Sequence, residues 1–295
     1  MKLVIKDLTK TYKNGVKAID NLSLEIGTGM FGLLGPNGAG KSSLMRTIAT
    51  LQSPDSGSIM FGDINVLEDK MALRKVLGYL PQSFGVYPKM SAEALLDYFA
   101  TLKGVSSKVE RNALVREVLE ITNLYDVRKK HVAGYSGGMK QRFGIAQLLL
   151  NNPKLIIVDE PTAGLDPAER HRFLNVLREV GTNCTVIFST HIVEDVKELC
   201  TDMAILNGGK ILMQATPTQA RESLRGKIWT KVVERDELEQ MEAMYNVLSS
   251  NYNEDNTLNI RVHSDTLPAD DFVAAEPQLD DVYFIALKQD EPMVS

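Results

Sequence analysis

The sequence predicts an α/β protein in which the main sheet is parallel and covered on both faces. Two continuous apolar runs of strand length, residues 30–34 and 155–158, lack the polar alternation of a half-exposed strand. The first run is followed by a glycine-rich loop and then by residues 43–50 with helical spacing, which predicts a strand–loop–helix unit. With 295 residues, the length is that of one large domain or two.

The loop at residues 35–42 fits the phosphate-binding pattern G-x-x-x-x-G-K-[ST]. Glycines allow a tight backbone turn, so that consecutive N–H groups can converge on phosphate oxygens at a helix N-terminus. Lys41 is expected to reach the β- and γ-phosphates, and the Ser42 hydroxyl to bind Mg²⁺. An ordinary glycine-rich turn is the alternative, which the flanking strand and helix disfavour. The residues expected to hold the nucleotide here are Gly35, Pro36, Asn37, Gly38, Ala39, Gly40, Lys41, Ser42 and Ser43.

Two acids, Asp159 and Glu160, follow the second apolar run directly. Because ligands of open α/β sheets bind at the carboxyl ends of strands, both acids should lie beside the phosphate-binding loop. Asp159 suits the Mg²⁺ shell, and Glu160 suits a general base that polarises the attacking water. The alternative is a pair of N-capping residues for the segment that begins with Pro161 and Thr162.

A third motif, Ser-Gly-Gly-x-x-Gln-Arg at residues 136–142, precedes an apolar helix predicted over residues 143–150. It begins 23 residues before Asp159 and resembles the signature motif of ABC-type ATPases. The resemblance covers residues 1 to about 217. The family usually has Leu where this chain has Tyr135, and we expect the tyrosine side chain to pack behind the loop. The residues that the resemblance implies as phosphate contacts are Ser136, Gly137 and Gly138.

Four further elements match the family in order along the chain. The resemblance implies that Tyr12 stacks on adenine and that His191 is the catalytic switch histidine. It also implies that Gln82 is the Q-loop glutamine, which acts in catalysis and binds Mg²⁺, and that residues 163–166 form the D-loop. Each single residue has an ordinary alternative. Tyr12 could be a strand-edge aromatic, Gln82 a cap of the loop before Pro88, and His191 a helix-start histidine.

The fold implied by this resemblance is that of a P-loop NTPase: a RecA-like core with an antiparallel β subdomain and an inserted helical subdomain. We expect the ATPase domain over residues 1–217 and its helical subdomain over about 85–145. Within the latter, helices are predicted from Ser91, as N-cap, through Leu102 and from Ser107 to Ile121. The segment from Phe84 to Met90, with Tyr87, is either the docking surface for a membrane partner or part of the local core.

Residues 218–295 are expected to form a small, acidic α/β accessory domain. Their net charge is −9, whereas residues 1–217 carry +4, and Pro217 stands at the junction. The elements predicted here are a strand over 227–233, a charged helix over 235–245, a hairpin pairing 247–252 with 257–262, and a last helix over 279–287.

The composition excludes several classes of protein. No run of about 18 apolar residues could span a bilayer, and the N-terminus lacks the apolar core of a signal peptide. The two cysteines, Cys184 and Cys200, are expected to be reduced and structural. The overall net charge of −5 and the lack of a coiled-coil or zinc insertion disfavour action on nucleic acid. With the resemblance, this predicts a cytoplasmic protein, peripheral on the inner face of the cell membrane.

The function implied by the resemblance is ATP hydrolysis in a transporter whose membrane-spanning subunits are separate chains. ATP and Mg²⁺ are the implied ligands, and a second copy of the chain and a transmembrane permease are the implied partners. In this family the signature serine of one subunit faces the γ-phosphate held by the other, so hydrolysis separates a head-to-tail dimer. The alternatives are a soluble ABC ATPase acting on DNA or ribosomes, and a regulator without turnover, which Glu160 and His191 disfavour.

Export is the favoured direction of transport. Residues 35–41, 163–167 and 279–283 resemble the drug- and polysaccharide-export-like ATPases of the ABC-2 type. The tail is also too short for the paired barrel-like regulatory domain of many importers. An importer ATPase is the alternative, and the transported substrate is not encoded in this chain.

Overall fold

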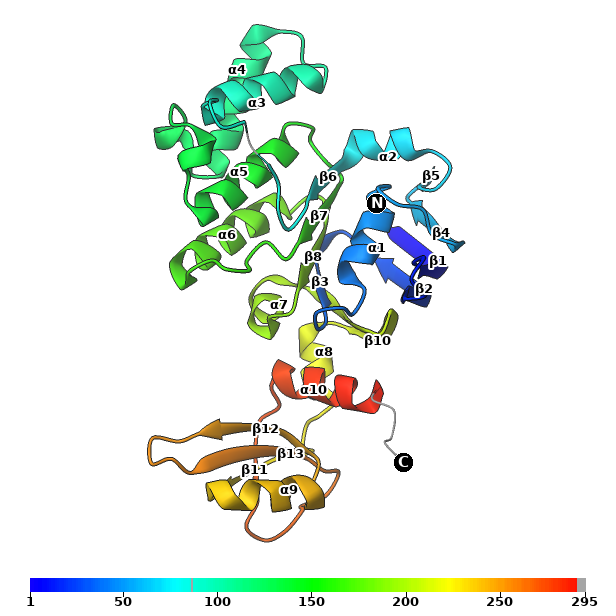
Figure 1. The fold of residues 1–295 in the computed structure, drawn as a ribbon, viewed down its shortest axis with the longest axis vertical. Coiled ribbons are helices and arrows are strands. Elements are labelled where there is room, and N and C mark those ends of the chain that lie inside the picture. The colour runs from blue at the N-terminus through cyan, green and yellow to red at the C-terminus, as the bar shows by residue number, and fades with distance from the viewer. Residues whose placement is uncertain (86, 291–295) are drawn as a thin grey trace.

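The structure is a computed structural model that describes residues 1–85 and 87–290 and contains three sheets (Figure 1). A central six-stranded sheet is flanked by a four-stranded antiparallel sheet formed by the N-terminal strands. A helical bundle lies at one end of the molecule, and a second four-stranded sheet lies at the other end. This is the mixed α/β architecture that the sequence predicts.

The central sheet has the strand order β10-β9-β3-β8-β7-β6, and every neighbouring pair is parallel except β10 with β9. Helices α6 and α7 join consecutive parallel strands, which is the connection that parallel pairing requires. Both predicted apolar strands are confirmed, as β3 and β7, and they lie on either side of β8. The elements are β3 (Gly29–Leu34), α1 (Lys41–Ile48), β6 (Leu77–Leu80), β7 (Leu155–Asp159), α6 (Pro167–Val180), β8 (Thr185–Thr190), α7 (Val193–Leu199), β9 (Asp202–Asn207) and β10 (Lys210–Ala215).

The antiparallel sheet, of order β2-β1-β4-β5, is the β subdomain that the resemblance implies. Its inward side chains share one buried apolar cluster with α1 and with β3, so it is packed directly against the central sheet. The elements are β1 (Leu3–Thr11), β2 (Lys17–Ile26), β4 (Ser56–Phe61), β5 (Ile64–Asn65) and α2 (Lys70–Val76).

The predicted helical segment follows β6 and forms its own apolar cluster. Ser91 is confirmed as an N-cap, since its hydroxyl accepts from the Ala94 N–H at 3.3 Å. In the segment expected to be either docking surface or core, Phe84 and Met90 are half-buried against apolar clusters, whereas Tyr87 is 54% exposed. Val86 lies outside the described residues. The elements are α3 (Ala92–Leu102), α4 (Lys108–Ile121), η1 (Tyr125–Val127), η2 (Val132–Gly134) and α5 (Gly137–Leu149).

The C-terminal part contains the predicted strand, helix, hairpin and last helix. Its antiparallel sheet has the order β12-β13-β11-β14, and the hairpin pairs Tyr252 with Leu258. Helix α9 covers one face, where Met241 packs in the cluster of Leu258 and Ile260. The elements are α8 (Pro217–Glu222), β11 (Ile228–Val233), η3 (Arg235–Glu237), α9 (Leu238–Met244), β12 (Val247–Tyr252), β13 (Leu258–His263), β14 (Val273–Ala274) and α10 (Leu279–Asp290).

Helix α10 lies between the tail sheet and the central part of the molecule (Figure 1). Its residues Leu279, Val282 and Ile285 belong to the buried cluster that contains β8, β9 and α7. Ala220 of α8 belongs to the same cluster. Residues before and after the predicted boundary at residue 217 therefore pack together in one apolar cluster. The division into residues 1–217 and 218–295 therefore stays a prediction. Within residues 1–85 and 87–290, no helix has the length and apolar character needed to cross a membrane.

Candidate active site

The loop of residues 35–40 connects β3 to α1 at the carboxyl end of the central sheet and depends on glycine at two close backbone approaches. A Cβ on Gly35 would lie 2.3 Å from the Leu206 carbonyl oxygen, and one on Gly40 would lie 2.2 Å from that of Ala18. Gly40 also has a φ of +108°, which L side chains rarely adopt. Helix α1 begins at the next residue, so its first N–H groups lack intrahelical partners. The predicted phosphate loop thus has its strand and helix.

Lys41 is the most enclosed cation of this region, with 4% of its side chain exposed. Its ammonium donates to the carbonyl oxygens of Gly35 at 2.7 Å and of Pro36 at 3.0 Å. The same nitrogen lies 3.1 Å from Glu160 Oε1. A buried charge is costly unless it is paired, so this carboxylate is the counter-ion of Lys41. The structure therefore joins the loop lysine to the predicted general base.

Asp159 ends β7 as a buried carboxylate beside the start of α1. Its Oδ1 accepts from the Ser42 hydroxyl at 3.3 Å and from the Ser189 hydroxyl at 2.7 Å. Burial and the nearby Asp159 charge raise the pKa of the Tyr79 phenol. The capping alternative for Asp159 and Glu160 is not what the structure has, because the next helix, α6, is N-capped by Asp166.

Glu160 adopts a φ of +46°, which is unusual for a residue with a side chain. Its N–H donates to Ser189, to the hydroxyl at 3.0 Å and to the carbonyl oxygen at 3.2 Å. Its Oε2 lies 3.4 Å from His191 Nδ1, and His191 is partly exposed. Sequence reasoning missed Ser189, although a polar residue at the end of the buried strand β8 was the available signal.

The oxygens of Ser42 and Asp159 are of the type that binds Mg²⁺ and lie side by side. Mg²⁺ prefers hard oxygen ligands and usually combines one or two carboxylates with phosphate oxygens and water. The two oxygen atoms are 3.3 Å apart and already share one hydrogen, so a cation would replace that contact with two ligand bonds. The residues present fit the metal, and Mg²⁺ binding itself stays a prediction.

Tyr12 follows β1 and lies against the beginning of α1. Its hydroxyl is 2.9 Å from Ser43 Oγ and donates to Gln52 Oε1 at 3.1 Å. The Gln52 amide in turn donates to the Ser43 carbonyl oxygen at 2.8 Å. The structure thus places the predicted adenine-stacking ring next to the phosphate loop and fixes it by two polar contacts. Gln52 was not anticipated from the sequence.

Gln82 is a predicted site residue for which the structure shows no hydrogen bond to the catalytic groups within the described part of the chain. It lies in the loop after β6, where its side chain is exposed. Among residues 1–85 and 87–290, no hydrogen bond joins this side chain to Asp159, Glu160 or Ser42. Its roles in catalysis and Mg²⁺ binding are still predictions that require the loop to move or a ligand to bridge the gap.

The signature residues begin helix α5 and face helix α6 of the same chain. The Ser136 hydroxyl accepts from the Met139 N–H at 3.2 Å and caps the helix. A Cβ on Gly138 would lie 2.1 Å from Glu169 Oε2 and 2.8 Å from Glu169 Cβ, so a larger residue would have to displace the Glu169 side chain of α6. The expected burial of Tyr135 is confirmed: its hydroxyl donates to the Val127 carbonyl oxygen at 3.0 Å. Gly137 begins α5 beside Leu165 of the D-loop segment.

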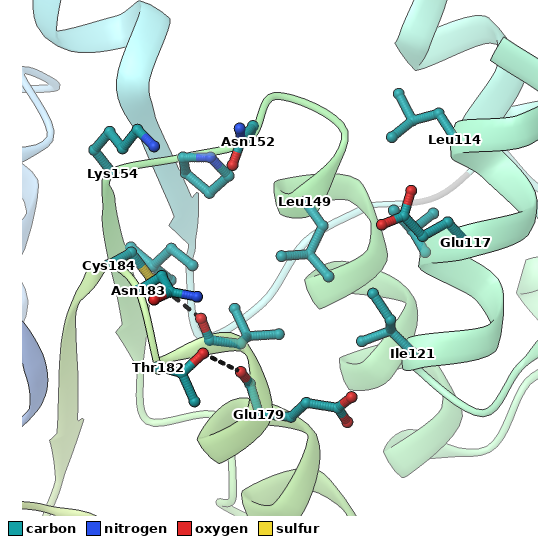
Figure 2. A pocket seen from close by; sticks show the side chains of 14 residues that line it. Leu114, Glu117, Ile121, Leu149, Asn152, Lys154, Glu179, Thr182, Asn183 and Cys184 are labelled. Carbon is teal, nitrogen blue, oxygen red and sulfur yellow. Dashed lines mark hydrogen bonds between the residues drawn. The ribbon is translucent and has the colours of Figure 1, made fainter. Parts of the chain in front are cut away.

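A cavity of about 420 Å³ lies away from these residues, between α4 and the amino ends of β7 and β8. Figure 2 shows Leu114, Glu117 and Ile121 facing it from α4, with Cys184 on the opposite wall. Burial raises the pKa of the Cys184 thiol. None of the predicted site residues lines this cavity, so it is separate from the candidate active site.

Comparison with protein families matches residues 19–163 to the family described as ABC transporter. The uncharacterized ABC transporter ATP-binding protein YxlF of Bacillus subtilis is 36% identical over 77% of this chain and 75% of its own length. The Nod factor export ATP-binding protein I of Rhizobium etli is 37% identical over 75% of this chain and 70% of its own length. The methionine import ATP-binding protein MetN of Carboxydothermus hydrogenoformans is 33% identical over 73% of this chain and 66% of its own length. Export and import proteins are thus both similar to this chain.

Two solved structures share the fold. The dimeric post-hydrolysis state of the ATP-binding cassette MJ0796, bound to ADP and Pi, has a TM-score of 0.65 and 27% identity over 72% of this chain and 98% of that one. The structure of cbiO1 from Clostridium perfringens, described as part of the ABC transporter complex cbiONQ, has a TM-score of 0.66 and 27% identity over 74% and 89%.

Proposed function

Because the chain belongs to the ABC transporter ATP-binding family, we propose that it is the ATP-hydrolysing subunit of an ABC exporter and powers a separate transmembrane subunit. One structural observation carries the proposal. Three side chains converge at one edge of the central sheet: Lys41 is suited to hold phosphate, Asp159 to hold a metal, and Glu160 to activate water. A binding module without turnover would not need Glu160 in this place.

The binding step uses residues around the start of α1. The first N–H groups of α1 and the Lys41 ammonium hold the β- and γ-phosphates, where their positive charge matches the anion. Tyr12, fixed by Ser43 and Gln52, stacks on the adenine ring. Mg²⁺, held by Ser42 and Asp159 and completed by Gln82, would neutralise phosphate charge when bound.

The hydrolytic step uses Glu160 and His191. Glu160 accepts a proton as water attacks the γ-phosphorus, and the bond from that phosphorus to the bridging oxygen breaks to give ADP and phosphate. His191 lies 3.4 Å from Glu160 and is partly exposed, so it can reach both the carboxylate and the γ-phosphate. The ATP-hydrolysis state seen for MJ0796 supports this activity in the family.

The second half of the site comes from a second copy of the chain. Ser136, Gly137 and Gly138 stand at the N-terminus of α5, which suits an anion, yet their neighbours in this chain are α6 and the D-loop segment. A head-to-tail homodimer supplies the γ-phosphate to this terminus. ATP then closes the dimer, and hydrolysis opens it. The dimeric form of MJ0796 supports this arrangement.

The partner that receives this motion is a transmembrane permease, which places the chain in the cytoplasm against the inner face of the cell membrane. The description of cbiO1 as part of a multi-subunit transporter complex supports a separate membrane chain. Exposed Tyr87, beside the Q-loop segment, is available for such a contact. The acidic composition gives no basis for a nucleic-acid partner.

We propose export as the direction of transport because this chain has a higher sequence identity to the Nod factor export protein, 37%, than to the methionine import protein MetN, 33%. The MetN similarity keeps an importer ATPase as the second candidate.

The first test is Mg²⁺-dependent ATP hydrolysis by the purified chain. Wild-type chain should release phosphate, Lys41→Ala should lower this by roughly 100-fold, and EDTA should abolish it. The chain should also co-purify with a membrane protein encoded next to it, and inside-out vesicles of the pair should accumulate the exported compound. A wild-type chain that binds no ATP at all would overturn the proposal, and uptake into right-side-out cells would favour the importer.

A further inference from the structure

One carboxylate that the proposed mechanism does not use is fully buried next to the site. Asp195, in the first turn of α7, has no exposed side-chain surface. Its Oδ1 accepts from Arg170 Nε at 2.6 Å. Its Oδ2 accepts from the hydroxyls of Thr162 at 2.7 Å and Thr190 at 3.1 Å. A buried carboxylate is stable only when such donors surround it, and hydrogen bonds to a charged group are strong. The carboxylate therefore holds all three donor side chains firmly in place.

These three donors come from three different segments of the site. Thr162 is two residues beyond Glu160, and Thr190 directly precedes His191. Arg170 lies on α6, the helix that begins at Pro167 and is N-capped by Asp166 of the D-loop. Within the part of the chain that the structure describes, the Asp195 carboxylate has no hydrogen bond to a group proposed to contact nucleotide. It instead connects the segments that carry them.

The contact with Thr190 restrains the backbone on both sides of His191. The Thr190 hydroxyl accepts from the Ile192 N–H at 2.9 Å, and it can then give its single proton to Asp195. The peptide units that flank His191 are therefore held by one hydroxyl whose orientation Asp195 determines. This fixes the direction in which the imidazole leaves the backbone.

The contact with Thr162 acts on the other side of the site. Glu160 has the left-handed φ of +46°, a conformation that persists only when the surrounding structure enforces it. Ser189 holds the Glu160 N–H, and Asp195 holds the chain two residues later through Thr162. Between these points the segment turns tightly, with the Ala163 N–H bonded to the Glu160 carbonyl oxygen at 3.3 Å.

We propose that Asp195 is a positioning residue for hydrolysis: its carboxylate holds Glu160, His191 and the D-loop helix in one fixed relative arrangement. The inference rests on the proposed ATPase function. A purely structural ion pair of Asp195 with Arg170 would need neither hydroxyl, and replacing a buried pair with apolar groups is often harmless to stability. Both hydroxyls come from the two segments that carry Glu160 and His191.

The main test is Thr162→Val, which keeps the shape of the side chain but removes the proton given to Asp195. We expect kcat for ATP hydrolysis to fall roughly tenfold, because a hydrogen bond to a charged group is lost. KM and the affinity for a fluorescent ATP analogue should stay within about twofold, and Thr162→Ser should restore most of kcat. The matched control is Thr185→Val, a buried threonine on β8 whose hydroxyl, among residues 1–85 and 87–290, bonds only to the Met1 carbonyl oxygen.

A second measurement combines Thr162→Val with His191→Ala. If Asp195 acts by holding Glu160 and His191 together, the double variant should lose less activity than the product of the two single effects. Asp195→Asn should show the same split of kcat from KM. Three results would overturn the inference. The first is an equal loss of kcat in Thr162→Val and Thr185→Val, and the second is a double variant whose loss equals the product of the two single losses. The third is a loss that appears as a higher KM instead of a lower kcat. Glu160→Gln separates the two claims: if it abolishes hydrolysis while Thr162→Val has no effect, the proposed function stands and the positioning role falls.

Discussion

The ammonium of Lys41 lies 3.1 Å from Glu160 Oε1, and both side chains are largely buried. The residue expected to hold the triphosphate is therefore neutralised by the residue expected to activate water. Bound phosphate has to take the place of this carboxylate as the counter-ion of Lys41. We therefore expect phosphate binding to release Glu160, the predicted general base, from Lys41.

The first prediction follows from that competition. Glu160→Gln should bind MgATP roughly three- to tenfold more tightly in the isolated chain, because the competing charge is gone. The same variant should hydrolyse ATP roughly 100-fold more slowly or worse, since it lacks the base. Equilibrium titration at protein concentrations too low for dimers measures the affinity. Glu160→Asp, which retains the charge, is the control, and weaker binding by Glu160→Gln than by wild type would contradict the competition.

The second prediction concerns sites shared between two chains. Lys41→Ala should impair ATP binding in one chain, whereas Ser136→Ala should spare it and weaken ATP-driven dimerisation. When the two variants are mixed, one composite site carries both lesions and the other carries neither, so part of the ATPase activity should return. Mixing Lys41→Ala with itself is the control. Mixed dimers that form, as shown by two affinity tags, yet stay inactive would argue against head-to-tail sites.

Residues whose environment is set by nearby sequence could be predicted well. The phosphate loop could be recognised from its own glycines and from the strand and helix that flank it, and Ser91 caps the helix that it precedes. The burial of Tyr135 could also be anticipated, because the residue before a signature loop has a hydrophobic helix to pack on, here through Phe143.

Contacts between distant segments could not be predicted. The position of Glu160 beside the phosphate loop was predicted, but its ion pair with Lys41 was not, because that contact depends on β7 and β3 both pairing with β8. The donors of Asp195 likewise come from a loop, the end of β8 and a helix, which meet only in the folded chain. Charge patterning predicted a separate tail, yet α10 buries its apolar side on the central part. Hydrophobic periodicity tells which face of a helix is buried but not against what.

The third prediction concerns the two cysteines and pH. Cys184 and Cys200 are buried free thiols, and burial raises the pKa of each, with the carboxylates of Asp195 and Asp202 adding to the effect at Cys200. Native chain should therefore react slowly with a maleimide even at about pH 9, where about half of an unfolded thiol is ionised. Because the thiol pKa is higher in the folded chain than in the unfolded chain, folding stability also depends on pH. The stabilisation from the two protonated thiols is complete below the ordinary thiol pKa of 9.0 and is lost as the pH rises above it.

The measurement is the labelling rate at neutral pH and at about pH 9, in native chain and in urea. Only the unfolded rate should rise steeply with pH. Cys184→Ala and Cys200→Ala identify which thiol reacts. A native rate that increases with pH in parallel with the unfolded rate would show that the thiols are reachable and would contradict their burial as structural groups.

The last prediction concerns the ion pair that joins α10 to the tail sheet. Arg261 donates from Nε to Asp281 Oδ1 at 2.8 Å and from Nη2 to Oδ2 at 2.7 Å, and Asp281 is 1% exposed. Removing Arg261 leaves Asp281 buried without its counter-ion, although the Gln278 N–H still donates to it, so Arg261→Ala should lower the free energy of unfolding of the tail by about 3 kcal/mol. The double variant Arg261→Met with Asp281→Leu should recover much of that loss, because the charge is removed together with its partner.

The chain offers a local probe for this measurement. Trp229 is its single tryptophan, and it lies in β11 with its indole N–H donating to the Ser264 carbonyl oxygen at 3.0 Å. Urea titration followed by tryptophan fluorescence therefore reports the tail sheet, while ATP-analogue binding reports the active site in the same samples. We expect Arg261→Ala to shift the fluorescence transition to lower urea and to leave nucleotide affinity within about twofold at low denaturant. An unshifted transition would mean that the pair does not hold α10 against the sheet. Equal losses in the single and double variants would mean that the geometry of the pair, and not its charge balance, is what stabilises the tail.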